Sequence, residues 1–100
     1  MLTSKQRARL RSKANQLETI LQVGKDGINE NMIMQANDAL TARELIKGRI
    51  LENAPFDSAR ECAFELAEKT GSETVQFIGT RFVLFRRNPD KGQFDEFLKG

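Results

Sequence analysis

VGKDGINENMI, residues 23–33, joins the end of an apolar segment to the beginning of a helix. Ile20–Val23 is short, apolar and bounded by Gly24, a pattern that predicts a strand. Asn29 is suited to be the N-cap of the helix that follows, because its short polar side chain can accept a hydrogen bond from the first turn. A strand, a turn with two glycines and a helix in direct succession predict an α/β domain.

Amphipathic helices are predicted on both sides of this two-glycine turn. Upstream, Thr3 and Gln6 form a capping-box pattern, and apolar residues at helical spacing extend a predicted helix from Ser4 to Glu18. Downstream, apolar residues repeat with the same period. They are Ile28, Met32, Ile33, Ala36 and Leu40. These stripes predict helices that each bury one face.

A second strand and a third helix are predicted further along the chain. ELIKGRIL, residues 44–51, contains β-branched residues without a helical period, and it predicts a strand with Lys47 and Arg49 on one face. Ser58 begins a capping-box pattern for the third helix, and Gly71 supplies its left-handed end.

A hairpin is predicted in ETVQFIGTRFVLFRR, residues 73–87. Gly79 followed by Thr80 suits a tight II′ turn, because glycine in the first position of that turn supplies a positive φ. The unbroken apolar run Phe82–Phe85 predicts a strand covered on both faces. The exposed aromatic strand of an RNA-recognition motif is the alternative, but the remaining positions do not fit its signature, and the buried strand is favoured.

The predicted element order is α-β-α-β-α-β-β, which gives one α/β domain over residues 1–87 with a four-stranded mixed sheet and helices packed on it. Residues 88–100 are polar and predict a tail with a helical turn around residues 94–98. One hundred residues with 39% hydrophobic content leave room for one modest core. No apolar run approaches the ~20 residues of a membrane helix and no leader for export is present, so we expect a cytoplasmic protein without a membrane partner.

Positive charge is concentrated at the beginning of the chain. The first quarter of the sequence contains six basic residues and one acid, a net charge of +5, whereas the other 10 basic and 13 acidic residues give −3. In the predicted first helix, Lys5, Arg9 and Lys13 form one stripe, and Arg7 and Arg11 lie on the other flank of the apolar seam. Such asymmetry is typical of a protein that binds a polyanion, and an ordinary solvated helix face is the equally weighted alternative.

The residue types available exclude most catalytic chemistry. The chain contains no histidine, the usual general base near neutral pH, and its single cysteine, Cys62, lies on the apolar stripe of the third predicted helix. One thiol with carboxylates does not make a typical zinc site. The two-glycine turn matches neither the P-loop nor the dinucleotide-binding pattern. The sequence therefore predicts a protein that is not an enzyme and that needs no metal or cofactor.

The two-glycine turn suggests a different way of binding phosphate. Gly24 and Gly27 lack Cβ atoms, so backbone N–H groups can approach a sugar-phosphate chain, and Lys25 adds a positive charge between them. The helix that begins near Asn29 offers a partial positive charge at the same place. KH domains clamp RNA with a G-x-x-G turn of this kind. The two glycines alone favour a plain strand-to-helix turn. Together with the basic first helix, RNA binding and a plain turn are equally favoured.

Longer stretches of the sequence resemble a known family. They are LTSKQRARLRSKANQLETILQVGKDGINENMI (2–33), ALTARELIKGRIL (39–51) and ARECAFELAEKTGSETVQFIGTRFVLFRR (59–87), which are similar to the CRM domain in its stand-alone bacterial YhbY form. The resemblance implies a fold related to the C-terminal domain of the third translation initiation factor, with the G-x-x-G turn in contact with RNA. It also implies an association with precursors of the large ribosomal subunit, while plant organelle relatives carry the domain in intron-splicing factors.

The motifs of this family fall on defined positions of the sequence. The G-x-x-G turn corresponds to Gly24–Gly27, the ELIK strand to residues 44–47, and the last strand to residues 83–86. Phe85 stands where tyrosine is common, which removes a hydroxyl group. Gly48 stands where a branched apolar residue is usual, and we expect the strand to be looser or bulged there.

The resulting hypothesis is a monomeric RNA-binding assembly factor whose partner is precursor ribosomal RNA, with ribosomal proteins as further partners. A protein-binding adaptor that docks on a ribosomal protein or another assembly factor is the main alternative, and a small-nucleotide sensor is a third. Asp26 places a negative charge in the turn, where it opposes phosphate or points to solvent. The predicted RNA-binding residues are Lys5, Arg7, Arg9, Arg11, Lys13, Gly24, Lys25, Asp26, Gly27, Lys47 and Arg86.

Overall fold

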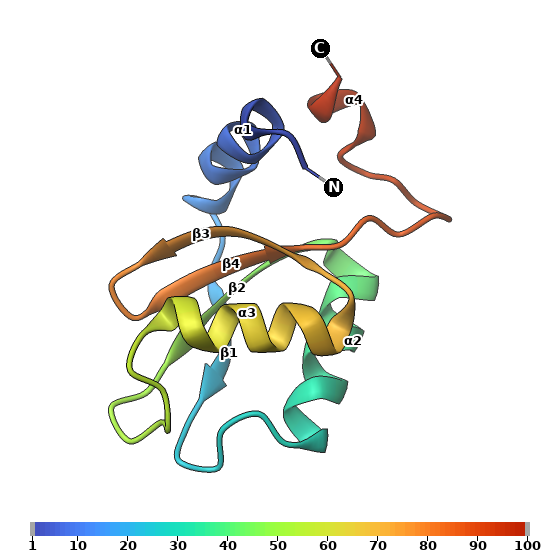
Figure 1. Ribbon diagram of the computed structural model, residues 1–100. Coiled ribbons are helices and arrows are strands. Elements are labelled where there is room, and N and C mark those ends of the chain that lie inside the picture. Colours follow the sequence, from blue (N-terminus) through green and yellow to red (C-terminus); the bar gives the residue numbers. More distant parts are fainter. Residues whose placement is uncertain (1, 100) are drawn as a thin grey trace.

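Four strands form a mixed sheet with helices on both of its faces (Figure 1). The computed structural model describes residues 2–99. Its elements are α1 (Ser4–Ala14), β1 (Thr19–Val23), α2 (Glu30–Arg43), β2 (Leu45–Ile50), α3 (Ala59–Thr70), β3 (Glu73–Ile78), β4 (Arg81–Phe85) and α4 (Asp95–Leu98). The strand order is β1-β2-β4-β3, in which β1 and β2 are parallel and the other two pairs are antiparallel. The predicted α/β class with a four-stranded mixed sheet is confirmed.

A separate core lies on each face of the sheet, so the prediction of one modest core is wrong. The larger core packs against α2 and α3 and contains Ile46 of β2 and Phe82 of β4. The smaller core packs against α1 and contains Leu45, Val83 and Phe85. Because successive residues of a strand point to opposite faces, the apolar run of β4 serves both cores, as predicted. With Phe82 only 1% and Phe85 only 5% exposed, neither ring is available to stack on a base, which excludes the RNA-recognition-motif alternative.

Local capping and turn chemistry agree with the sequence at four places. The side chains of Asn29 and Ser58 each accept a hydrogen bond from the backbone N–H three residues later, at 2.9 and 3.2 Å, and so begin α2 and α3. Gly71 ends α3 with φ +66°, and Gly79 begins the β3–β4 turn with φ +57°. At both glycines a side chain would meet the steric cost of the left-handed region.

The first helix is shorter than predicted. Thr3 and Gln6 form the expected capping box, but α1 ends at Ala14 and does not reach Glu18. The N–H of Leu17 donates to the carbonyl of Ala14 at 3.0 Å, a tighter turn than that of an α-helix. This turn brings Leu17 against the smaller core and leads the chain into β1. The predicted helix end is wrong because Leu17 keeps the apolar spacing of the helix after the helix has stopped.

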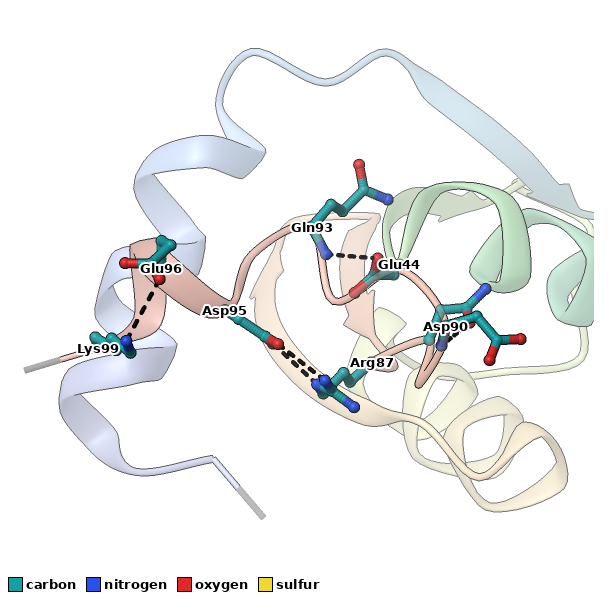
Figure 2. Close-up of polar contacts among 8 residues, drawn as sticks. Glu44, Arg87, Asp90, Gln93, Asp95, Glu96 and Lys99 are labelled. Carbon is teal, nitrogen blue, oxygen red and sulfur yellow. Dashed lines mark hydrogen bonds and ion pairs between the residues drawn. The ribbon is translucent and has the colours of Figure 1, made fainter.

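The second strand begins at Leu45, one residue later than predicted, because Glu44 ends α2. Glu44 has a φ of +65° and its N–H donates to the carbonyl of Leu40 at 2.8 Å. Its side chain is fully buried, and Oε2 accepts a hydrogen bond from the N–H of Gln93 at 3.0 Å (Figure 2). A single residue with positive φ thus turns the chain from α2 into the sheet.

Gly48 leaves space for an aromatic ring. It pairs with Phe82 in an unbroken β2–β4 ladder, and a Cβ at this position would lie 2.5 Å from Cζ of Phe82. The sequence predicts a looser or bulged strand at Gly48, but the irregularity lies in the neighbouring strand β1, where the register shifts between Thr19 and Leu21. Glycine at position 48 is therefore a packing requirement of the larger core.

The segment predicted as a polar tail folds back over the smaller core. Arg87 donates two hydrogen bonds to Asp95, both 2.9 Å long (Figure 2). Phe94 packs edge-on against Phe85 with ring centroids 6.0 Å apart, and Leu98 contacts the same core. The helical turn expected around residues 94–98 is present as α4.

Candidate nucleic-acid interface

The two-glycine turn connects β1 to α2 at one end of the sheet (Figure 1). The N–H of Gly27 donates to the carbonyl of Gly24 at 3.0 Å and closes a β-turn whose central residues are Lys25 and Asp26. Both central side chains are exposed to solvent. The turn therefore carries one cation and one anion at its tip, and the chain reaches this point directly from a rigid strand.

The two glycines of the turn are present for different reasons. Gly27 is buried with φ +64°, and a Cβ there would lie 3.0 Å from Cγ of Pro55. Gly24 lacks a positive φ, and a Cβ there would meet only the side chains of Leu51 and Asn53 at ordinary distances of 3.7 and 3.8 Å. The fold therefore requires glycine at position 27 but not at position 24, where the missing side chain leaves clearance on the outer surface.

The N-terminus of α2 faces a surface hollow beside the turn. Asn29 accepts a hydrogen bond from Met32, while other N–H groups of the first helical turn have no partner within the helix. The hollow has a volume of about 430 Å³. It is lined by Gln22, Gly24, Lys25, Asp26, Gly27, Asn29, Asn31, Met32, Gln35, Leu51 and Asn53. Lys25 and the helix terminus favour an anion in this hollow, and Asp26 opposes one.

Three of the five predicted cations of α1 are engaged within the protein. Arg7 Nε donates to a backbone carbonyl of β3 at 3.1 Å. The Arg9 guanidinium donates to the carbonyl of Lys99, and the Lys13 ammonium lies 4.8 Å from the centroid of the Phe97 ring. These side chains hold α1 against β3 and against the segment after β4.

The other two cations of α1, Lys5 and Arg11, are exposed and form no ion pair or side-chain hydrogen bond within residues 2–99. Figure 1 shows α1 and the two-glycine turn at opposite ends of the molecule, with β1 running between them. The structure therefore does not bring together the basic helix and the turn, the two parts of the site that the sequence predicts.

Arg86 connects three elements of the fold. Its Nη1 donates to Oδ1 of Asn37 and to the carbonyl of Thr70, both at 2.7 Å. Its Nη2 donates to the carbonyl of Asn37 at 3.0 Å and to Oγ1 of Thr41 at 2.9 Å. These four hydrogen bonds tie the chain after β4 to α2 and α3, and we therefore leave Arg86 out of the candidate interface.

Lys47 lies half-buried on the sheet face that α1 covers only in part. Arg49 shares that face, and Arg81 of β4 stands directly opposite Arg49. The sequence predicts the common face of Lys47 and Arg49 from strand alternation but misses Arg81. Only the pairing of β2 with β4 brings these two arginines together, and neither segment alone carries a signal for that pairing.

The single cysteine, Cys62, is free and fully buried. Burial raises the pKa of the Cys62 thiol to about 12, with further contributions from Glu65 and Glu61, so the thiol stays protonated and belongs to the larger core. No group of three metal-binding side chains occurs in residues 2–99. The helices of that range are also too short or too polar to cross a bilayer.

Comparison with known proteins gives consistent matches over nearly the whole chain. The model of the CRS1 / YhbY (CRM) domain matches residues 2–86. The chain is 45% identical over 95 residues to Probable RNA-binding protein YqeI of Bacillus subtilis, a match that covers 95% of this chain and 98% of that protein. Probable RNA-binding protein PA4753 of Pseudomonas aeruginosa is 33% identical over 88 residues, which cover 88% of this chain and 84% of that one.

A solved structure supports the fold as well. The solution structure of the protein SAV1595 from Staphylococcus aureus superposes with a TM-score of 0.74 at 52% sequence identity. The superposition covers 87% of this chain and 90% of the other. The range matched by the family model contains the complete sheet and the two-glycine turn.

Proposed function

This chain belongs to the CRS1 / YhbY (CRM) domain family, and on that premise we propose that it binds RNA by seating the sugar-phosphate backbone on the Gly24–Gly27 turn. The relatives are named for RNA binding, and these names indicate no catalysis. The chain is accordingly an RNA-binding protein and not an enzyme. The contact residues and the identity of the RNA are the parts that we propose.

The observation that carries this proposal is the glycine at position 24. The backbone there lacks the positive φ that would favour glycine, and a Cβ would fit at ordinary contact distances. Packing therefore gives no reason for glycine at this position. Close approach of an external backbone does give one, because a side chain would stand between the ligand and the N–H groups of the turn.

Charge at the turn supports a phosphate ligand. Lys25 is exposed at the tip, and the N-terminus of α2 contributes a partial positive charge and free N–H groups. Asp26 is exposed beside Lys25, so its carboxylate can point to solvent while the lysine contacts phosphate. Lys5 and Arg11 belong to α1, which lies at the opposite end of the molecule from the turn (Figure 1), and they act by attracting RNA over a distance.

The proposed RNA is that of a precursor of the large ribosomal subunit, on which the protein acts as a monomer in the cytoplasm during assembly. This part of the proposal is supported by the resemblance to bacterial YhbY proteins. A turn that clamps the backbone of about four nucleotides suits single-stranded segments within structured RNA.

Replacement of Lys25 by Asp tests the turn. We expect the affinity for labelled fragments of ribosomal RNA to fall about tenfold or more, since a hydrogen bond to a charged group contributes roughly 1.5–3 kcal/mol. Fluorescence anisotropy measures the affinity, and thermal unfolding checks that the fold is kept. Lys91→Asp makes the same charge change at an exposed position in the segment after β4 and serves as the matched control. Wild-type affinity in the Lys25→Asp variant would disprove the proposed contact.

A second experiment separates RNA binding from a protein-binding adaptor. The tagged protein is sedimented with ribosomal particles from a cell extract, with and without complete digestion of RNA. Loss of co-sedimentation after digestion and crosslinks that map to ribosomal RNA support the proposal. Binding that survives digestion favours the adaptor.

A further inference from the structure

One face of the sheet is covered by α1 over only part of its length. Leu45 and Phe85 lie beneath α1 in the smaller core. Toward the other ends of β2 and β4, alternation places Lys47, Arg49 and Arg81 on the same face. Lys47 and Arg49 are half-buried and Arg81 is exposed, so this part of the face is open to solvent.

The register of the sheet arranges the open part as a row of side chains. Gln22 of β1 pairs with Arg49 of β2, Arg49 pairs with Arg81 of β4, and Arg81 pairs with Ile78 of β3. Gln22 also lines the hollow beside the two-glycine turn, so the row begins at that turn. Neighbouring strands are ~4.8 Å apart, and the row therefore crosses the sheet over about 14 Å. We call this surface the sheet platform, formed by Gln22, Lys47, Arg49, Gln76, Ile78 and Arg81.

The cations of the sheet platform are not neutralised by the protein. No ion pair within residues 2–99 involves Lys47, Arg49 or Arg81. Arg49 and Arg81 stand directly opposite each other, and like charges in that position destabilise a sheet. The Nε of Arg49 is in addition buried without a hydrogen-bond partner. An anion placed beside the two arginines would relieve their repulsion.

Apolar and amide groups adjoin these cations. A second hollow of about 190 Å³ is lined by Asn15, Lys47, Gln76, Ile78, Arg81 and Val83. Ile78 is 61% exposed, although it is apolar, and offers a surface on which a base can pack. Asn15 and Gln76 carry amide groups that can both donate to and accept from the edge of a base. The cations suit a phosphate, and the neighbouring apolar and amide groups suit a base. This combination fits a nucleotide better than an acidic peptide.

We infer that the sheet platform binds a single-stranded RNA segment that continues from the two-glycine turn, with phosphates beside Arg49 and Arg81 and a base against Ile78. This inference rests on the proposed function and extends it to a second surface. The sheet platform lies between the turn and α1, and it fills the space that separates these two predicted parts of the site.

Arg81→Gln tests the sheet platform, Lys25→Asp tests the turn, and Lys91→Gln is the surface control. Each variant is titrated with labelled single-stranded RNA of four and of twelve nucleotides at several salt concentrations. A turn of this kind contacts about four nucleotides, so only the longer RNA reaches the sheet platform. We expect Arg81→Gln to bind the short RNA as the wild type does and the long RNA at least about fivefold more weakly. The slope of log affinity against log salt should become shallower by about 0.7, the value for one phosphate contact.

Thermal unfolding distinguishes lost contact from lost structure. Arg81→Gln removes one of two facing positive charges, so its unfolding midpoint should equal or exceed that of the wild type. A lower affinity for the long RNA at an unchanged or raised midpoint therefore supports the inference. Wild-type affinity and salt slope for the long RNA in Arg81→Gln overturn it, whether or not Lys25→Asp is impaired.

The two proposals fail separately in this design. If Lys25→Asp binds both RNAs normally and only Arg81→Gln is impaired, the proposed contact at the turn is wrong. The sheet platform then remains the RNA site. A glutamate-rich peptide and unlabelled long RNA are each added as competitors. If the peptide displaces the labelled RNA more strongly than the unlabelled RNA does, the surface belongs to a protein partner and the inference is overturned.

Discussion

The two ends of the sheet use their basic side chains in opposite ways. At the tail end, formed by α1 and the segment after β4, Arg9 and Arg86 donate to carbonyl and amide oxygens of the protein itself. Arg87 donates to the carboxylate of Asp95 (Figure 2). At the turn end, formed by the two-glycine turn and the sheet platform, Lys25 and Arg81 are exposed and form no ion pair within residues 2–99. At the tail end most basic side chains stabilise the fold, although Lys5 and Arg11 of α1 stay exposed; at the turn end the positive charge is available to a ligand.

A cluster of basic residues in the sequence is therefore a poor measure of the positive charge that is exposed to a ligand. The first quarter of the chain carries a net charge of +5, yet three of its six basic side chains are engaged at the tail end. Residues later in the chain, where the net charge is −3, supply the arginines of the sheet platform.

The largest effect on stability is expected at the tail end. Arg86→Met removes four hydrogen bonds and leaves the carbonyl of Thr70 and the side chain of Asn37 without their donor. We expect the free energy of unfolding to fall by about 3 kcal/mol, measured by urea denaturation. Arg86→Lys keeps the charge but not the planar fork, and should recover only part of the loss. A lower RNA affinity of Arg86→Met under conditions where the protein is fully folded would place Arg86 in the interface.

The two glycines of the turn give the next largest contrast. Gly27→Ala forces a side chain into the left-handed region beside Pro55, and should cost about 1–2 kcal/mol of unfolding free energy. Gly24→Ala meets no such strain, and its stability should stay unchanged or rise by up to about 1 kcal/mol because the unfolded chain is restricted. RNA affinity should nevertheless fall in Gly24→Ala. A variant that is both stable and fully active in binding would contradict the clearance argument.

Removal of residues 89–100 is expected to have a smaller effect on stability and to raise RNA binding. The partial burial of Phe94 and Leu98 is lost, which we expect to cost about 1 kcal/mol in thermal unfolding. Arg9 and Lys13 lose their partners in the segment and become available to phosphate, so affinity at low salt should rise a few-fold. Adding Arg9→Gln to the truncated chain should reverse part of that gain. Unchanged affinity after truncation would show that these cations remain out of reach of RNA.

The smallest expected effect is a pH dependence of the docked segment. Hydrogen bonding from Arg87 holds the pKa of Asp95 below its ordinary value of 3.8. Because the pKa is lower in the folded state, the pair stabilises docking above about pH 3.8 and loses this contribution as the pH falls through the lowered value. Amide NMR signals of residues 92–98 should therefore shift toward undocked positions in acid. In Asp95→Asn the same signals should show no such transition, and an identical transition in that variant would rule out this pair as its cause.

Local chemistry explains why much of the fold could be predicted. Asn29 and Ser58 cap helices through hydrogen bonds to residues three positions away, and Gly71 and Gly79 occupy backbone conformations that depend on their own φ values. Each of these signals is contained within a few consecutive residues. The element order and the two-glycine turn follow from such signals and need no tertiary information.

Nonlocal contacts explain what could not be predicted. Leu17 continues the apolar spacing of α1 but packs after a turn, and only the smaller core decides where the helix ends. Arg86 becomes structural because α2 and α3 bring three acceptor-bearing residues to it. Arg81 joins Arg49 because β4 inserts between β2 and β3. The roles of Arg81 and Arg86 are therefore set by partners more than ten residues away in the sequence.

The Phe82 ring occupies the space in which a side chain at position 48 would stand. A Cβ at position 48 would lie 2.5 Å from Cζ of Phe82, so any side chain larger than that of glycine would have to displace the ring. Positions 48 and 82 are therefore coupled in packing, since a larger residue at 48 clashes with the ring and a smaller residue at 82 leaves a cavity in the larger core.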